Sequence, residues 1–151
     1  MDLPVRLLRP GARLPRRAYA GDAAFDLHAA VDVVLGPQQR AVVPTGIALG
    51  LPPGVAALTL PRSGLAARSG ITVLNAPGLI DPGYRGEIQI VLFNTDLAAA
   101  FPVQAGDRIA QLLVVGLPEV SLVEVDSLDD TARGARGFGS SGTGAGGVDD
   151  A

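Results

Sequence analysis

Short runs of apolar residues, each ended by glycine, proline, asparagine or aspartate, recur along most of the chain. These runs are rich in β-branched residues, and their length and punctuation are typical of strands joined by tight turns. Many short strands in succession predict an all-β fold, as a sandwich, a jelly roll or a barrel. We expect strands within residues 3–9, 31–35, 41–51, 54–60, 70–75, 86–94, 108–117 and 120–128.

One stretch departs from the strand pattern. The segment SGLAARSG, residues 63–70, opens with serine and closes with glycine, which is typical of a short helix. The apolar periodicity stops after Leu128, and the chain then becomes rich in glycine. We therefore expect one domain over residues 1–128 and a C-terminal arm over residues 129–151, which is ordered only where something holds it.

Composition limits the chemistry that this domain can perform. The 151 residues contain no cysteine and one histidine, which excludes thiol nucleophiles and almost excludes a multi-histidine metal site or a Ser-His-Asp triad. We expect that histidine, His28, at the surface or in an interface rather than in catalysis. The net charge of −3 offers no general attraction to nucleic acid or to an anionic membrane, so an anion site must be built locally.

The N-terminal stretch MDLPVRLLRPG lacks the uninterrupted apolar run of a signal peptide. No segment reaches the length and apolarity of a membrane span. We expect the protein in the cytoplasm.

The segment PRSG, residues 61–64, joins an expected strand to the expected helix. Backbone N–H groups at a helix start, the Ser63 hydroxyl and the Arg62 guanidinium could together bind an anion, and Gly64 would let the backbone approach closely. The alternative is an ordinary helix N-cap beside a surface arginine. The segment alone does not decide between the two.

The segment NAPGLIDPGYRGEIQI, residues 75–90, has the turn residues of a hairpin. Asp81 lies between Leu79-Ile80 and a Pro-Gly turn, and Tyr84 follows three residues later. Such a hairpin could place a carboxylate and an aromatic ring at the mouth of a pocket. Asp81 would be ionised at neutral pH and able to activate a water. The alternative is a β-turn in which Asp81 caps its own backbone.

Three further segments are candidates. Gln111, in GDRIAQLLV, lies inside an apolar strand and must hydrogen-bond to protein, water or ligand, with a satisfied structural glutamine as the alternative. Asp26, in AGDAAFDLHA, could face an anion-bound metal or another subunit. The arm segment RGARGFGSSG combines two arginines with an aromatic residue among glycines.

Taken together, the five segments resemble the five motifs of the trimeric dUTP diphosphatase (dUTPase) family. In chain order they read AGDAAFDLHA, PRSGLA, NAPGLIDPGYRGE, GDRIAQLLV and RGARGFGSSG, and they span nearly the whole chain. The resemblance implies a jelly-roll-like β-barrel that assembles as a homotrimer with three active sites at the subunit interfaces. One subunit would bring the hairpin, a neighbour would bring Asp26, the PRSG turn and Gln111, and the third would lend its arm.

The implied reaction is the hydrolysis of dUTP to dUMP and diphosphate, which limits uracil incorporation into DNA and supplies dUMP for dTMP synthesis. Mg²⁺ chelated by the triphosphate is the implied cofactor. Asp81 matches the catalytic carboxylate that deprotonates the water attacking the α-phosphorus. Asp26 matches a residue near the water shell of the metal, which implies an outer-sphere role.

The resemblance also implies the phosphate contacts. Ser63 and Gln111 would contact the phosphates, and Arg62 and Gly64 would complete the turn. In the arm, Arg133 matches an arginine that reaches the terminal phosphate. Three residues of the arm would close on the phosphates: Gly139, Ser140 and Ser141.

Specificity is expected to come from the hairpin and the arm. Asn75 and the backbone of Leu79 and Ile80 would pair with the edge of uracil, which excludes cytosine. The Tyr84 ring would pack on the deoxyribose where a 2′-hydroxyl would sit, which excludes UTP. Two further residues would touch the nucleotide, a position of variable type and an aromatic that stacks on uracil: Gln89 and Phe138.

One residue of the arm departs from the family pattern. Arg136 stands where the family usually has glycine, and it could restrict the backbone or add a phosphate contact.

Two alternatives remain open. A dCTP deaminase, or its bifunctional form, shares the fold and the Ile-Asp-Pro-Gly turn, but its turn is typically followed by an aromatic other than tyrosine. Here Glu87 follows Tyr84-Arg85-Gly86 as in dUTPases. A non-catalytic nucleotide-binding trimer would be expected to lack Asp81 or the arm motif, and both are present.

Overall fold

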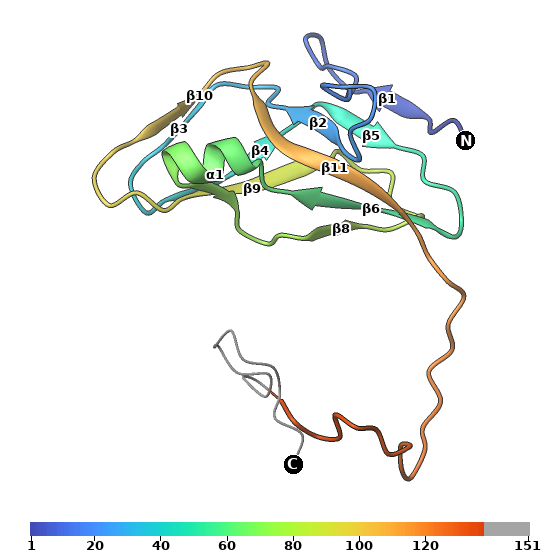
Figure 1. Cartoon of the computed structure of the whole chain (residues 1–151). Coiled ribbons are helices and arrows are strands. Elements are labelled where there is room, and N and C mark those ends of the chain that lie inside the picture. Colours follow the sequence, from blue (N-terminus) through green and yellow to red (C-terminus); the bar gives the residue numbers. More distant parts are fainter. Residues whose placement is uncertain (138–151) are drawn as a thin grey trace. The chain divides into compact units, whose positions relative to one another are not determined.

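A computed structural model describes residues 1–137 of the chain (Figure 1). The chain divides into two units, Met1–Glu119 and Val120–Ala151, and the secondary structure of the described residues lies in the first unit. One helix, α1, covers Ser63–Ser69. The strands are β1 Val5–Leu7, β2 Phe25–His28, β3 Val33–Leu35, β4 Arg40–Pro44, β5 Ile47–Leu49, β6 Val55–Leu60, β7 Ile71–Val73, β8 Gly78–Ile80, β9 Gln89–Asn94, β10 Phe101–Val103 and β11 Arg108–Gly116.

The strands form antiparallel sheets. The largest sheet has the order β2-β11-β6-β8, and a second has the order β4-β9-β7. Two strand pairs, β1-β5 and β10-β3, complete the first unit. The all-β fold predicted from the sequence, with one short helix, is confirmed.

The core is filled by side chains that alternate along the strands. On β9, Ile90, Leu92 and Asn94 are buried, while Gln89, the first residue of the strand, is exposed. Burial of alternate apolar residues is what a strand with one face on a core requires. Further core side chains come from β2, β4, β5, β7 and β11: Leu27, Val43, Ile47, Ile71 and Leu112.

The helix begins and ends near the expected residues. Arg62, rather than Ser63, is the N-cap residue, and no side chain caps the helix. Gly70 ends it in the left-handed conformation, with φ of 62°, and donates its N–H to carbonyl oxygens of the last turn. Of residues 1–137, none forms a helix long and apolar enough to cross a membrane.

Two of the expected strands differ in the structure. The run 41–51 is divided into β4 and β5, because Gly46 adopts a φ of +74° between them. The strand expected at 120–128 is wrong, since these residues carry no regular secondary structure and are exposed. Alternation of apolar and polar residues stabilises a strand only where another strand pairs with it, and no strand of the described residues pairs with this segment.

Candidate functional site

A pocket of about 390 Å³ lies beside the segment that connects β7 to β9 and contains β8. The hairpin expected over residues 75–90 is wrong as a strand pairing, because β8 pairs with β6 whereas β9 pairs with β4 and β7. Six residues expected from the sequence to bind the nucleoside or to act on water line this pocket: Asn75, Leu79, Ile80, Asp81, Tyr84 and Gln89. The structure therefore brings together side chains that are spread over 15 positions of the sequence, 75–89. We call this the hairpin pocket.

The turn of the hairpin presents the carboxylate of Asp81 to solvent. The Tyr84 N–H donates to the Asp81 carbonyl oxygen at 3.1 Å, which closes a β-turn. Asp81 is exposed, and its carboxylate accepts no hydrogen bond from residues 1–137. The turn is thus present, but Asp81 does not cap it, and the carboxylate is free to meet a ligand or a water.

The wall opposite the turn depends on a glycine of β8. Gly78 pairs with Thr59 of β6, and a Cβ at Gly78 would lie 2.3 Å from Thr59 Oγ1 and 3.2 Å from Asn75 Nδ2. Only glycine allows this approach of β8 to the Thr59 side chain. The close packing brings buried Thr59 and exposed Asn75 to the same pocket.

Sequence reasoning missed half of the pocket lining. These residues come from β4, β6, β8 and β9 and from the limb between Tyr84 and β9: Val42, Thr59, Gly78, Glu87, Ile88 and Val91. Val42 and Thr59 precede the hairpin in sequence and lie beside it only through strand pairing. The sole sequence signal was the Gly-Leu-Ile run, whose glycine marks a close backbone approach.

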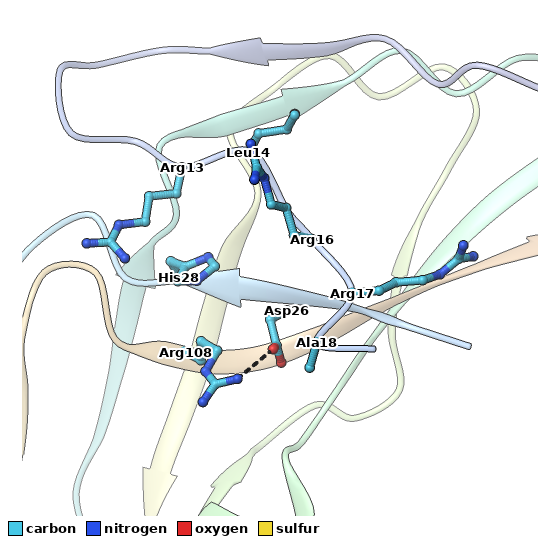
Figure 2. Close-up of a pocket in the computed structure, with 8 residues that line it drawn as sticks. All are labelled: Arg13, Leu14, Arg16, Arg17, Ala18, Asp26, His28 and Arg108. Carbon is cyan, nitrogen blue, oxygen red and sulfur yellow. Dashed lines mark hydrogen bonds and ion pairs between the residues drawn. The ribbon is translucent and has the colours of Figure 1, made fainter. Parts of the chain in front are cut away.

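A second pocket, of about 450 Å³, is rich in arginine (Figure 2). Its lining comes from residues 13–18, β2 and β11: Arg13, Leu14, Arg16, Arg17, Ala18, Asp26, His28 and Arg108. Figure 2 shows Arg108 reaching toward Asp26, while the guanidinium groups of Arg13 and Arg17 point away from it on opposite sides. We call this the arginine pocket.

Asp26 is the carboxylate at the centre of the arginine pocket. Its residue is 6% exposed, and its two oxygens face two arginines, with Oδ2 3.2 Å from Arg108 Nη1 and Oδ1 3.4 Å from Arg62 Nε. A buried carboxylate needs such partners to offset the loss of hydration. Asp26 therefore holds the Arg62 guanidinium beside β11.

The PRSG turn is more than a helix start with a surface arginine. Arg62 also donates from Nη1 to the Arg108 carbonyl oxygen at 2.9 Å, so its side chain is anchored at both ends of the guanidinium. Ser63 makes no capping hydrogen bond, which leaves its hydroxyl exposed. Arg62 is thus held by the protein itself, and anion binding by this turn stays a prediction.

Gln111 lies next to the same carboxylate. It pairs with Asp26 on one side and with Leu60 on the other, so β11 places it between β2 and the end of β6. Gln111 is half-buried, and its side chain makes no hydrogen bond within residues 1–137. The structure therefore brings Asp26, Arg62 and Gln111 together, and it leaves the amide of Gln111 available to a ligand.

His28 lies in the arginine pocket rather than at the open surface. Burial lowers the pKa of His28 below its ordinary value, and the positive charge of Arg13 lowers it further. Its Nδ1 atom is buried and has no hydrogen-bond partner within residues 1–137.

The two pockets have no lining residue in common. The hairpin pocket offers a carboxylate, an aromatic ring and backbone groups, whereas the arginine pocket offers positive charge. In residues 1–137, no three histidine, cysteine, aspartate or glutamate side chains gather as a metal-binding cluster.

Within the arm, Arg133 and Arg136 form a local turn. Each guanidinium donates to the carbonyl oxygen of the other residue, at 3.3 and 3.1 Å, and Arg136 also donates to the Ala132 carbonyl oxygen. The side chain that departs from the family pattern therefore restrains its own backbone. Four residues expected in the site lie outside the described part of the chain: Phe138, Gly139, Ser140 and Ser141.

Comparison with known proteins identifies the family. The family model named dUTPase matches residues 11–142. The chain is 56% identical over 145 residues to the deoxyuridine 5'-triphosphate nucleotidohydrolase of Thermobifida fusca, a match that covers 96% of this chain and 81% of that protein. It is 52% identical over 140 residues to the Tropheryma whipplei protein of the same name, covering 93% and 96% of the two chains.

Solved structures agree with this assignment. The dUTPase of Staphylococcus bacteriophage 80alpha with dUPNHPP matches with a TM-score of 0.87 and 31% identity, over 93% of this chain and 98% of that chain. A mutant dUTPase from phage phi11 of S. aureus, described with a structural Mg(II) ion, matches with a TM-score of 0.80 and 29% identity, over 86% and 100% of the two chains.

Proposed function

The chain belongs to the dUTPase family and hydrolyses dUTP to dUMP and diphosphate, and we propose that its active site combines the hairpin pocket of one copy with the group formed by Asp26, Arg62 and Gln111 of another. One observation supports this arrangement above others. The residues expected to hold the nucleoside line the hairpin pocket, whereas Arg62 and Gln111, which are expected at the phosphates, lie beside Asp26 and do not line that pocket. A homotrimer, as the motif pattern implies, would join the two halves.

The hairpin pocket would select the base and the sugar. β8 has exposed Leu79 beside buried Ile80, and its peptide groups would pair with the edge of uracil together with the Asn75 amide. Cytosine would present the wrong donors and acceptors and leave buried polar groups unpaired. The Tyr84 ring would occupy the space that a 2′-hydroxyl of UTP needs.

Asp81 would act as the general base. Its carboxylate is exposed at the pocket mouth and is not engaged by residues 1–137. A carboxylate in this state can orient a water and take its proton as the water attacks the α-phosphorus. The P–O bond to the diphosphate then breaks and releases dUMP, without a covalent intermediate.

The other half of the site would hold the triphosphate. Asp26 and the Arg108 carbonyl fix the Arg62 guanidinium, so this donor would meet a phosphate already oriented. Ser63 and Gln111 each have a polar group with no protein partner in the described chain, and Gly64 permits the backbone to approach. These groups would bind the phosphates of dUTP and, after the reaction, the diphosphate.

Mg²⁺ fits this site as an ion held mainly by the substrate. Of the residues that line the arginine pocket, Asp26 is the sole carboxylate, and both of its oxygens already face arginines, so we propose that it meets the ion through water. Bound to the triphosphate, the ion would withdraw charge from the phosphates and stabilise one conformation.

The arm, residues 129–151, is proposed to close over the site of a neighbouring copy. Arg133 would reach the terminal phosphate, and Phe138 would stack on uracil. The glycines of this segment would allow backbone N–H groups to approach the phosphates. The cytoplasm remains the expected location.

A diphosphate-release assay with dUTP, dCTP, dTTP and UTP tests the proposal. We expect release from dUTP alone, loss of activity in EDTA, and loss of nearly all turnover in Asp81→Asn with dUTP binding retained. Near-normal kcat in Asp81→Asn would overturn the general-base role. Ammonia release from dCTP would identify a deaminase instead.

The composite site is tested by mixing two inactive variants. Asp81→Asn lacks the base and Arg62→Ala lacks the phosphate ligand, so dissociation and reassociation of both chains together should restore part of the activity. No recovery in reassociated mixed oligomers would show that both halves act within one chain.

A further inference from the structure

An ion pair connects the N-terminal segment to the hairpin pocket. Arg9 Nη2 lies 2.7 Å from Glu87 Oε2, although the two residues are 78 positions apart in sequence. The Glu87 side chain is 17% exposed and lines the hairpin pocket, while the Arg9 side chain is 38% exposed. A charge-assisted hydrogen bond of this length restrains both side chains.

The other oxygen of Glu87 is also engaged. Glu87 Oε1 accepts the N–H of Gly46 at 2.8 Å, and Gly46 has a φ of +74°. A Cβ at Gly46 would lie 3.1 Å from Arg9 Cγ, so the Arg9 stem packs directly on this glycine. The neighbouring Leu8 N–H donates to the Gly46 carbonyl oxygen at 2.8 Å. Arg9, Gly46 and Glu87 thus form a closed unit, which we call the Arg9 brace.

The brace holds the limb of the hairpin that follows Tyr84. The Tyr84 hydroxyl donates to the Glu87 carbonyl oxygen at 3.0 Å, so the ring and the braced residue are directly linked. The next residue, Ile88, donates to the Ile47 carbonyl oxygen at 2.8 Å and accepts the Thr45 hydroxyl at 2.6 Å. Movement of Glu87 would therefore move the anchor of the Tyr84 hydroxyl.

We propose that Arg9 is a positioning residue for the choice of deoxyribose over ribose. Arg9 pairs with the Glu87 side chain, the Glu87 backbone carbonyl oxygen accepts the Tyr84 hydroxyl, and the Tyr84 ring would fill the space of a 2′-hydroxyl. This inference rests on the role of Tyr84 given under the proposed function. Without Arg9 the Tyr84 ring can move away from the sugar. The kcat/KM for UTP then rises relative to that for dUTP, even where the fold and the catalytic carboxylate are unchanged.

The experiment compares kcat/KM for dUTP and UTP in Arg9→Ala, in Arg9→Lys and in a matched control, Arg6→Ala. Arg6 lies on β1, is exposed, and forms no ion pair within residues 1–137. We expect the ratio of kcat/KM for dUTP to kcat/KM for UTP to fall about two- to fivefold in Arg9→Ala. This range is the effect on an equilibrium constant that the loss of a partly exposed ion pair typically has. Arg9→Lys should recover part of the ratio, and Arg6→Ala should keep it.

A double-mutant cycle locates the effect. Tyr84→Phe removes the hydroxyl that Glu87 anchors, so its effect on the ratio and that of Arg9→Ala should be less than additive. Independent, additive effects would overturn the proposed path through Glu87. A purely structural loss would lower the activity on both nucleotides and leave their ratio unchanged, which would also overturn the proposal.

The outcomes separate this inference from the proposed function. If Tyr84→Ala leaves the ratio unchanged, the role of Tyr84 itself fails. If Tyr84→Ala lowers the ratio while Arg9→Ala matches the control, the positioning role of Arg9 fails alone. Should Arg9→Ala not fold, Arg9→Gln and Arg9→Lys give the same readout, and a ratio equal to wild type in both would reject the proposal.

Discussion

Replacing Gly78 by alanine should distort the hairpin pocket through a single methyl group. The new Cβ would lie 2.3 Å from Thr59 Oγ1, well inside van der Waals contact, and 3.2 Å from Asn75 Nδ2. Thr59 is buried on β6 and is β-branched, so its side chain has little freedom to turn away. β8 must therefore move away from β6, and it carries Leu79 and Ile80 with it.

The size of the effect follows from overpacking. Inserting a methyl group into a well-packed site costs about 1–3 kcal/mol. If this free-energy cost appears as weaker binding of dUTP, it corresponds to an increase of KM for dUTP of about 5- to 150-fold. Asp81 lies beyond the clash, in the turn, so kcat should change less than KM.

The assay is steady-state hydrolysis of dUTP together with urea unfolding of each variant. Gly83→Ala is the matched control, because a Cβ there meets nothing within 4 Å in the same hairpin. The double variant Gly78→Ala/Thr59→Ala removes the atom that clashes and should recover most of the lost affinity. If Gly78→Ala behaves like Gly83→Ala, or if the double variant recovers nothing, the steric reasoning is refuted.

Three further predictions address other parts of the molecule. Asp26→Asn should lower the free energy of unfolding by about 1–3 kcal/mol, because it leaves Arg62 without its counter-charge. This range lies between the values for exposed and buried ion pairs. Urea unfolding measures the change, and a value under about 0.3 kcal/mol would contradict the prediction. Truncation after Leu128 should impair hydrolysis but leave the oligomer seen by size-exclusion chromatography unchanged, and full activity would exclude a role of the arm in closure. Hydrogen bonds from the backbone N–H groups of Ala99 and Ala98 lower the pKa of Asp96 below its ordinary value, so its stabilising effect is present above the unfolded-state pKa and is lost as the pH falls through the lower, folded-state pKa. The difference in unfolding midpoint between wild type and Asp96→Asn should therefore shrink in acid, and a difference that is constant with pH would contradict this reasoning.

The sequence predicted elements best where the local pattern and the pairing agree. The helix at 63–70 and most strands carry their own boundaries in glycine and proline, and they appear within a few residues of the expected positions. β2, β8 and β10 were missed, because strands of three or four residues contain too few positions to reveal alternation, and β10 even includes a proline. The segment 120–128 has the alternation but no paired strand in the described chain.

The candidate site likewise contains residues that local sequence predicts and residues that only strand pairing brings together. Asn75, Asp81 and Tyr84 lie within ten consecutive residues, 75–84, so local sequence was enough to predict that they share a pocket. Thr59 and Arg108 could not be found, since their contacts with Gly78 and Asp26 depend on the register between strands distant in sequence. Register is decided by the burial of whole strands, which a single motif does not report.

The position of β8 in its sheet has a consequence for self-association. β8 is the last strand in the order β2-β11-β6-β8, and within residues 1–137 no strand pairs with its outer edge. An open edge can recruit a strand from another molecule and start aggregation. Pro77 and Pro82 flank this edge closely and provide no N–H, so the segment with which a strand of another molecule could pair is very short. Few peptide groups are left open between the two prolines, so the exposure of β8 that the proposed base recognition requires carries little risk of fibril growth.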